Sequence, residues 1–197
     1  PICAANLGFV CIDEASLSFL GTNRSLGYQF VYPWPRQVYG RLIAELATQG
    51  ARAVAVDMIL GELHTDDPPI LMADGQALDS DEFFAGQMRR ANNVILAVPA
   101  DLTPPPLFLT NALALGDIST RTDPEGVLRR AQAFRVHRRW HSAFRQVEAE
   151  PGFGVDLQQA RVERGRVVLP RREGEPIIVP LDQDGSFDVA DFGGDKL

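Results

Sequence analysis

The sequence predicts an α/β fold with a mainly parallel central sheet, flanking helices and an antiparallel C-terminal addition. Three short apolar runs, at residues 7–12, 53–59 and 94–98, carry this prediction. None of them alternates cleanly with polar residues, and unbroken apolar runs of this length are typical of strands buried on both faces. Helical patterns lie between the runs. The order strand, helix, strand, helix, strand therefore predicts parallel strands joined by right-handed crossovers.

Size and composition indicate a single domain over residues 1–197. A hydrophobic fraction of 45% is ordinary for a globular protein, and 197 residues suffice to bury a full core. The net charge of −7 argues against nucleic acid as a partner, because binding it needs clustered lysine and arginine. No run reaches the roughly 18 apolar residues of a membrane span. Extended backbone from Cys3 to Cys11 would separate their Cα atoms by roughly 26 Å, which predicts two free thiols.

Two helices are predicted between the three strands. The first begins at Pro35, where the missing N–H of proline costs nothing, and apolar residues recur at helical spacing over 38–46. The second covers 81–91, with Ser80 as its N-cap and a left-handed turn at 92–93 as its end. Both helices are expected to bury their apolar faces.

The segments after these helices are less regular. The long, polar and acidic stretch 60–80 is interpreted as an exposed loop over one end of the sheet. A third helix is predicted over 106–115, and a short strand over 117–119. The turn residues at 123–126, followed by a strand over 127–136, are typical of a hairpin.

Beyond residue 140 the patterns weaken further. A helix is predicted over 142–150, and short strands over 167–169, 177–179 and 187–189. We interpret this tail as the antiparallel addition to the main sheet and not as a separate domain.

Asp13 and Asp57 fall at or near the carboxyl ends of the first two predicted strands, the edge at which open α/β sheets bind ligands. Two carboxylates there can hold Mg²⁺ or Ca²⁺, bind a polar ligand or pair with an arginine, or else they cap the next turn or helix. Arg36 opens the first predicted helix and can reach an anionic ligand at this edge. A buried salt bridge to Asp13 or Asp57 is favoured for it, because an unpaired buried charge is costly. Glu62, beside His64 in an acidic loop interpreted as solvated, completes the candidate ligand-binding set of Asp13, Arg36, Asp57 and Glu62.

Motifs of the common enzyme classes are missing from the sequence. It has no Gly-x-Ser-x-Gly elbow and no P-loop, and no phosphate-binding glycine pattern follows the first predicted strand. No cofactor or metal site is therefore predicted, and the domain is not expected to be an enzyme. Two alternatives stay open. One is a sensor that binds protein or dimerises, with Trp34 and Phe108 as anchors if exposed, and the other is a metal-dependent hydrolase that uses Asp13 and Asp57.

Several ordered motifs resemble those of a known family. They are Ile-Asp-Glu-Ala-Ser-Leu at 12–17, Tyr-Pro-Trp-Pro-Arg at 32–36, and the run from Leu46 to Asp57. With Gly116-Asp117 and Asp-Pro-Glu-Gly-Val-Leu-Arg at 123–129, they make the chain similar to the type-2 CHASE domain. Glu125 stands where that family usually has a second aspartate. Domains of this family are extracellular sensors of bacterial adenylate cyclases, histidine kinases and serine/threonine kinases.

The resemblance covers residues 7–136 well and the remainder loosely. It implies an extracytoplasmic, periplasmic input domain of an inner-membrane receptor, with a transmembrane helix before it and further helices and a cytoplasmic cyclase or kinase domain after it. The abrupt start at Pro1 and end at Leu197 agree with a piece of such a receptor. The resemblance implies no particular ligand. We therefore expect an unidentified small molecule or ion, and whether the domain forms a homodimer stays open.

Overall fold

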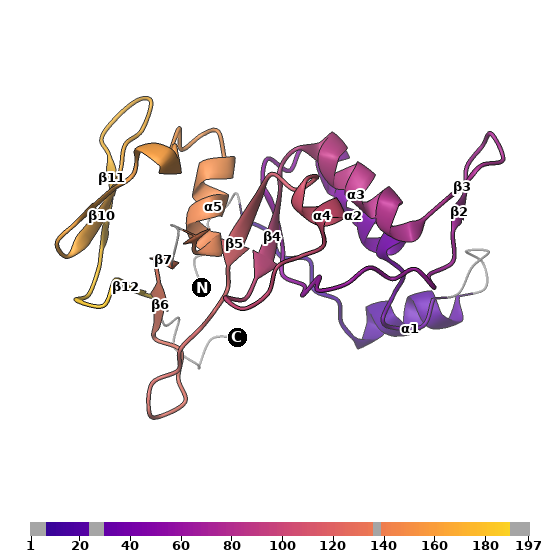
Figure 1. Ribbon diagram of the computed structural model, residues 1–197, viewed down its shortest axis with the longest axis horizontal. Coiled ribbons are helices and arrows are strands. Elements are labelled where there is room, and N and C mark those ends of the chain that lie inside the picture. Colours follow the sequence, from indigo (N-terminus) through magenta and orange to yellow (C-terminus); the bar gives the residue numbers. More distant parts are fainter. Residues whose placement is uncertain (1–6, 24–29, 136–138, 190–197) are drawn as a thin grey trace.

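The computed structural model describes residues 7–23, 30–135 and 139–189, and it has two lobes (Figure 1). The N-terminal lobe, within residues 7–117, holds a three-stranded parallel sheet with helices around it. The C-terminal lobe, within residues 130–189, holds a further helix and small antiparallel sheets. The predicted α/β class, with parallel strands first and antiparallel strands after them, is thereby confirmed.

The central sheet consists of β1 (Val54–Val56), β4 (Val94–Val98) and β5 (Ala114–Asp117). Its order is β1-β4-β5, and all its strands are parallel. β1 and β4 confirm two of the three predicted core strands. Every residue of β4 is buried, as a continuous apolar run predicts for a strand covered on both faces. β4 and β5 end together at Val98 and Asp117, and β1 ends two residues earlier, beside Leu96; we call this side of the sheet the carboxyl edge.

The strand predicted at 7–12 is wrong for this structure. This segment and Asp13 form neither helix nor strand, and α1 (Glu14–Thr22) begins directly after them. Asp13 is the N-cap of α1, and its carboxylate accepts a hydrogen bond from the Ser16 N–H at 2.9 Å. The chain therefore turns into a helix here and does not leave the end of a strand. The apolar side chains of the segment are exposed, that of Phe9 by 75%.

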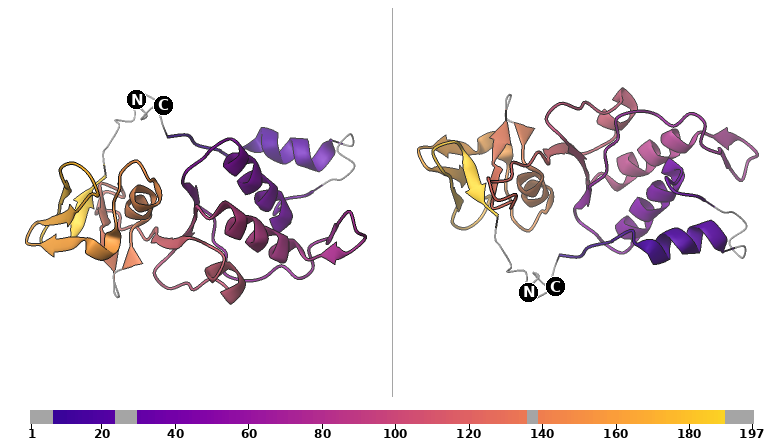
Figure 2. Two further views of the ribbon diagram at one scale, coloured as in Figure 1. Left: turned by 90° about the horizontal axis from the view of Figure 1, so that it is seen from above. Right: turned by 90° about the horizontal axis from the view of Figure 1, so that it is seen from below.

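α2 (Arg36–Thr48) and α3 (Ser80–Ala91) confirm the two predicted helices and cover one face of the sheet (Figure 2). They run side by side, and Gly40 of α2 permits close contact, because a Cβ atom there would lie 2.9 Å from the Phe83 ring. No helix in the described ranges is long and apolar enough to cross a membrane. The first core cluster contains the following buried residues: Trp34, Tyr39, Ile43, Val54, Leu60, Phe84, Ala85, Met88, Val94, Leu96 and Phe108.

The N-cap of α3 differs by one residue from the prediction. Asp79, and not Ser80, caps the helix, and its carboxylate accepts a hydrogen bond from the Asp81 N–H at 2.8 Å. Ser80 is buried, and its hydroxyl accepts a hydrogen bond from the Gln37 N–H at 2.9 Å, which joins α3 to the first turn of α2. Asn92 ends the helix in the left-handed conformation with φ 50°, as predicted.

The stretch 60–80 is more ordered than predicted. It contains a hairpin of β2 (Ile70–Leu71) and β3 (Ala77–Leu78), paired antiparallel. Leu60 and Ile70 are buried, and Leu60 belongs to the first core cluster. The expectation of a wholly exposed loop is therefore wrong at these apolar positions, which gain more by burial than by solvation.

The helix predicted over 106–115 is wrong beyond its first turn, α4 (Pro106–Leu109). The residues after this turn lead into β5, because parallel pairing with β4 satisfies their backbone groups. β5 also takes the place of the short strand predicted over 117–119, and it ends at Asp117.

The C-terminal lobe is built mainly from short antiparallel strands, as predicted, but the expectation that they extend the main sheet is wrong, because these strands form small sheets of their own around a second core. Its elements are β6 (Arg130–Gln132), β7 (Phe134–Arg135), β8 (Arg139–Trp140), α5 (Ser142–Ala149), the 3-10 helix η3 (Leu157–Gln159), β9 (Arg161–Glu163), β10 (Arg166–Leu169), β11 (Ile177–Pro180) and β12 (Ser186–Asp188). The strand predicted over 127–136 is broken in two, and β6 pairs with β12 while β7 pairs with β8. A three-stranded sheet has the order β11-β10-β9.

α5 connects the two lobes. It packs against β1, β4 and β5 and covers the sheet face opposite to α2 and α3 (Figure 1). Gly116 of β5 permits this contact, because a Cβ atom there would lie 2.6 Å from the Cα atom of Ser142. α5 also contributes to the second core cluster, whose buried members are Ala133, Trp140, Phe144, Val155, Leu157, Ala160, Val167 and Leu169.

Candidate functional site

Arg36 lies at the start of α2 in a buried network of charged side chains. Its Nε lies 3.8 Å from Oδ1 of Asp81 in α3, and its Nη2 lies 3.2 Å from Nε2 of His64. The Asp67 carboxylate accepts a hydrogen bond from the backbone N–H of Arg36 at 3.0 Å. Only 7% of Arg36 and 1% of Asp81 are exposed. Arg36 therefore forms a buried ion pair, but the predicted partners Asp13 and Asp57 are wrong, because its partner is Asp81.

The other three predicted ligand residues are exposed. Asp13 accepts hydrogen bonds from the hydroxyl and the N–H of Ser16, which lower the pKa of its carboxyl group, so its capping role is confirmed. Asp57 directly follows β1, and Glu62 lies in the loop after it. Among the residues that the structure describes, no ion pair or hydrogen bond joins Arg36 to these three carboxylates. A ligand-binding role for the set stays a prediction.

Asp117, at the end of β5, is a buried carboxylate on the carboxyl edge. It is 2% exposed, and its Oδ1 accepts hydrogen bonds from Nε of Arg135 at 3.2 Å and from the Ser119 N–H at 2.8 Å. Its Oδ2 is buried and has no hydrogen-bond partner in the described part of the chain. Asp57 lies two strands away, roughly 10 Å along the edge at the usual strand spacing. The edge therefore has a buried ion pair at its β5 end and an exposed carboxylate at its β1 end.

A cavity of about 330 Å³ lies beside this ion pair, and we call it the Arg135 pocket. This volume is at the lower end of the range for small-molecule sites, about 300–1,000 Å³. Arginine and hydroxyl side chains recur in its lining. The lining residues are Ser119, Arg121, Thr122, Asp123, Arg129, Arg130, Gln132, Arg135, Asp184 and Ser186.

The turn at 123–126 contributes to one side of the Arg135 pocket. The Asp123 carboxylate accepts hydrogen bonds from the N–H groups of Glu125 and Val127, at 3.1 and 3.0 Å, and the bond from Val127 is the main cause of its lowered pKa. The guanidinium of Arg129 pairs with both Asp123 and Glu125, the latter at 2.8 Å. The predicted turn is confirmed. Glu125, which replaces the usual aspartate of the resembled family, still supplies an acceptor for Arg129.

The arginines of the pocket differ in how far neighbouring carboxylates neutralise them. Arg130 pairs with Asp182 at 2.6 Å and with Asp188 at 3.4 Å. Arg121 is exposed and has no carboxylate partner within the described ranges. A guanidinium in this state can form two parallel hydrogen bonds to a carboxylate or phosphate group. The pocket can therefore hold a small anion.

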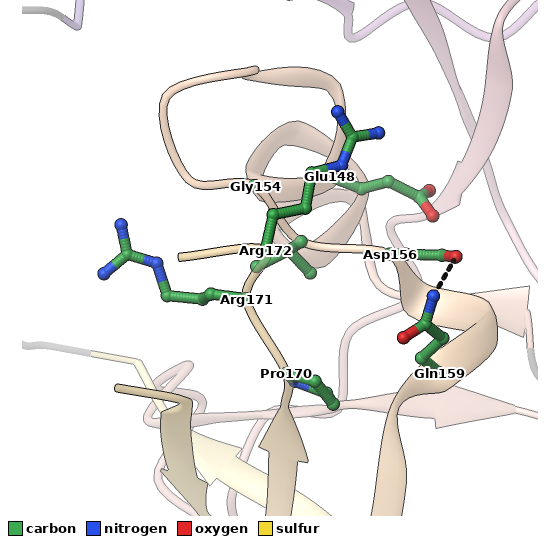
Figure 3. A pocket seen from close by; sticks show the side chains of 8 residues that line it. Glu148, Gly154, Asp156, Gln159, Pro170, Arg171 and Arg172 are labelled. Carbon is green, nitrogen blue, oxygen red and sulfur yellow. Dashed lines mark hydrogen bonds between the residues drawn. The ribbon is translucent and has the colours of Figure 1, made fainter. Parts of the chain in front are cut away.

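A second cavity, of about 350 Å³, lies in the C-terminal lobe (Figure 3). Its acidic residues already have partners, since Glu148 accepts a hydrogen bond from the Leu157 N–H at 3.0 Å and Asp156 accepts one from the side chain of Gln159 at 3.0 Å. Figure 3 shows Arg171 pointing away from Asp156 and Gln159. The bond from Leu157 ties η3 to α5. We assign these polar side chains to the fold of the lobe.

His141, directly before α5, connects stability to pH. Its Nδ1 accepts a hydrogen bond from the Ala143 N–H at 3.2 Å, so Nδ1 carries no proton when it caps the helix. Burial lowers the pKa of His141 from 6.5, while the Asp117 carboxylate acts in the opposite direction. Because the folded-state pKa lies below the unfolded one, the unfolded chain binds the proton first. This contribution to stability is complete above about pH 6.5 and is lost progressively as the pH falls below that value and through the lower folded-state pKa.

We therefore expect the melting temperature (Tm) to fall between about pH 7 and pH 5, and His141→Asn to remove that part of the slope. Asparagine keeps the cap, because its side-chain oxygen can accept the same N–H. Thermal unfolding of both proteins at a series of pH values measures the effect. Contributions from other groups cancel in the difference between the two profiles. Equal slopes of Tm against pH in the two proteins would show that His141 does not cause the pH dependence of stability.

The sequence did not predict the Arg135 pocket. The two aromatic anchors that it suggested for a protein partner are buried. The lining comes from the turn after β5, from β6 and β7, and from the turn before β12, which are far apart in the chain. The available signal is the concentration of arginine over 121–145, which stands out in a chain of net charge −7. Trp34 and Phe108, the suggested anchors for a protein partner, belong to the first core cluster.

The family model of the CHASE2 domain matches residues 5–190 of the chain. The matched range includes both lobes, the Arg36 network and the whole lining of the Arg135 pocket. No curated protein and no solved structure matches the chain. The resemblance found in the motifs of the first half is thereby confirmed over nearly the whole chain.

Proposed function

We propose that this chain, which belongs to the CHASE2 family of sensory domains of signalling proteins, is a single sensory domain. In this proposal it binds a small anion in the Arg135 pocket. Members of this family are sensors and not catalysts. Arg121 is the observation that carries the ligand class, because its guanidinium lines a cavity of small-molecule size and no described carboxylate neutralises it. Carboxylate and phosphate groups match the fork of a guanidinium. The proposed ligand is therefore a small carboxylate or phosphate compound.

We propose that the domain lies outside the cytoplasmic membrane, in the periplasm of a bacterial cell. In this proposal, transmembrane helices on both sides tether it to the inner membrane and connect it to a cytoplasmic cyclase or kinase domain. Family membership supports this arrangement. A ligand changes the output only if it binds one arrangement of the domain more tightly than another, since equal affinity shifts no population.

We propose Asp13, Arg36, Asp57 and Glu62 as further ligand contacts, of which Arg36 and Asp57 lie toward the β1 end of the carboxyl edge. α2 precedes β1 and packs on the sheet, so the N-terminus of α2, with Arg36, lies toward the edge at which β1 ends. Asp57 leaves β1 at the same edge. A polar ligand longer than roughly 10 Å would reach from the Arg135 pocket to Asp57.

Arg121→Ala is expected to reduce stabilisation by the ligand to about half or less without changing the fold. The probes are inorganic phosphate and small dicarboxylates such as succinate, and the measurement is the shift in Tm. A ligand at 100 times its Kd stabilises the folded state by about 2.7 kcal/mol. Loss of one charge-assisted hydrogen bond, about 1.5–3 kcal/mol, weakens binding roughly tenfold or more.

Arg89→Ala is the matched control, because Arg89 is also exposed but lies in the last turn of α3, outside the pocket. Without ligand, both variants should unfold close to the Tm of the unmodified chain. Stabilisation by an anion that is undiminished in Arg121→Ala would place the site elsewhere. If none of the probes stabilises the unmodified chain, the proposed ligand class is wrong.

A further inference from the structure

The segment 7–12 is an apolar run whose large side chains are exposed. Leu7 is 50% exposed, Phe9 75% and Val10 60%, and the segment forms neither helix nor strand. Figure 2 shows it as an indigo coil that leads into α1. Exposed apolar side chains that are contiguous mark a contact surface on a soluble domain. The segment therefore needs a partner.

β1 offers a free sheet edge. The order β1-β4-β5 leaves β1 paired on one side only, within the part of the chain that the structure describes. Ala55, in the middle of β1, is exposed. An edge strand presents unpaired N–H and C=O groups and acts as a template for another strand. The central sheet can therefore accept a fourth strand beside β1.

The segment and β1 have the same residue pattern. Val-Cys-Ile-Asp at 10–13 corresponds to Val-Ala-Val-Asp at 54–57. With Cys11 opposite Ala55, residues 10 and 12 fall on the face where Val54 and Val56 contact the first core cluster, because side chains alternate along a strand. The connection through α1 and α2 exceeds the dozen or so residues that a parallel crossover needs.

We propose that residues 7–12 dock on the free edge of β1 as a fourth parallel strand, with Cys11 opposite Ala55. The arrangement described above is the undocked one, and docking makes a second arrangement of the same domain. Docking brings Asp13 to the carboxyl edge beside Asp57, about 5 Å away at the usual strand spacing. The inference does not depend on the proposed ligand, so the two proposals fail separately.

Disulfide trapping tests the docking. Ala55→Cys is combined with Cys3→Ser, since Cys3 lies outside the described residues and would compete, while Cys11 has a free, exposed thiol. Neighbouring strands lie about 4.8 Å apart, within the Cα separation of about 4.4–6.8 Å that a disulfide spans. Mild oxidation is expected to join Cys11 to the introduced thiol within one chain. Peptide mass spectrometry identifies the link, and non-reducing electrophoresis shows it at the position of the monomer.

Leu71→Cys in the same background is the matched control, because Leu71 is also exposed but lies in β2, outside the central sheet. It is expected to give no link above background. The proposal is overturned if the yield of the disulfide to Cys11 is no higher from a cysteine at position 55 than from one at position 71. A link between two chains also overturns it and would assign the edge of β1 to a second copy. If Ala55→Cys does not fold, backbone amide hydrogen exchange of the unmodified chain tests the docking instead. Docking is expected to slow exchange at residues 9–12. Exchange there as fast as in other exposed loops overturns the proposal.

Discussion

Replacing Arg36 with methionine is expected to lower the free energy of unfolding by about 3–5 kcal/mol, the usual effect of removing one partner of a buried ion pair. Methionine keeps an apolar side chain in the site but leaves the Asp81 carboxylate buried without its cation. Burial already raises the pKa of Asp81, and the Arg36 guanidinium opposes that rise. The variant also loses the contact to His64, so α2, α3 and the loop between them lose a common anchor.

The loss of stability caused by Arg36→Met is expected to be smaller at acidic pH. Without the guanidinium, the pKa of Asp81 in the folded state rises further above its unfolded value. The destabilisation is therefore present above that raised pKa and is relieved as the pH falls through it, because the buried carboxyl group becomes neutral. Urea unfolding at neutral and at acidic pH measures both effects.

Arg41→Met is the matched control for Arg36→Met. Arg41 is exposed on the same helix, and its guanidinium lies 5.5 Å from the centroid of the Phe83 ring. Its replacement is expected to lower the free energy of unfolding by about 1 kcal/mol at most. If the two variants lose equally little, the ion pair with Asp81 does not hold the helix ends together.

Gly116→Ala is expected to destabilise the protein by about 1–3 kcal/mol or more, because it overpacks the contact between β5 and α5. The added methyl group would lie 2.6 Å from Cα and 2.9 Å from Cβ of Ser142. The first of these atoms belongs to the backbone, so the whole helix has to move. Any movement of α5 away from β5 opens the contact between the two lobes and disturbs Phe144 in the second core cluster.

Gly86→Ala is the matched control for Gly116→Ala. Gly86 lies in α3, and a Cβ atom there would have no heavy atom within 4 Å. Alanine is the better helix former, so this variant is expected to be more stable by about 0.5–1 kcal/mol. Calorimetry of both variants should give shifts in Tm of opposite sign. An unchanged or raised Tm for Gly116→Ala would mean that β5 and α5 do not need this close approach.

Elements with local signals were predictable from the sequence. Pro35 at the start of α2 and the left-handed Asn92 at the end of α3 act through their own backbone preferences. The apolar run of β4 is long enough to identify a strand buried on both faces, wherever its neighbours lie. These features depend on residues close together in the chain, so one sequence suffices to find them.

Pairing between distant segments was not predictable in the same way. Residues 7–12 have a stronger strand pattern than Ala114–Asp117, yet it is the second segment that pairs with β4. Which carboxylate reaches Arg36 likewise depends on the packing of α3 against α2, and this selects Asp81. The Arg135 pocket exists only after the turn behind β5 and the turn before β12 come together.

The sequence by itself determined the CHASE2 family, the α/β class, the main helices and the need of Arg36 for a buried acidic partner. The tertiary structure alone decided the identity of that partner, the third strand of the sheet, and the cavity where an anion could bind. The reason is that local backbone preferences are properties of short segments. Ion pairs and strand pairs stabilise the protein, and cavities form, only when segments far apart in the chain are packed together.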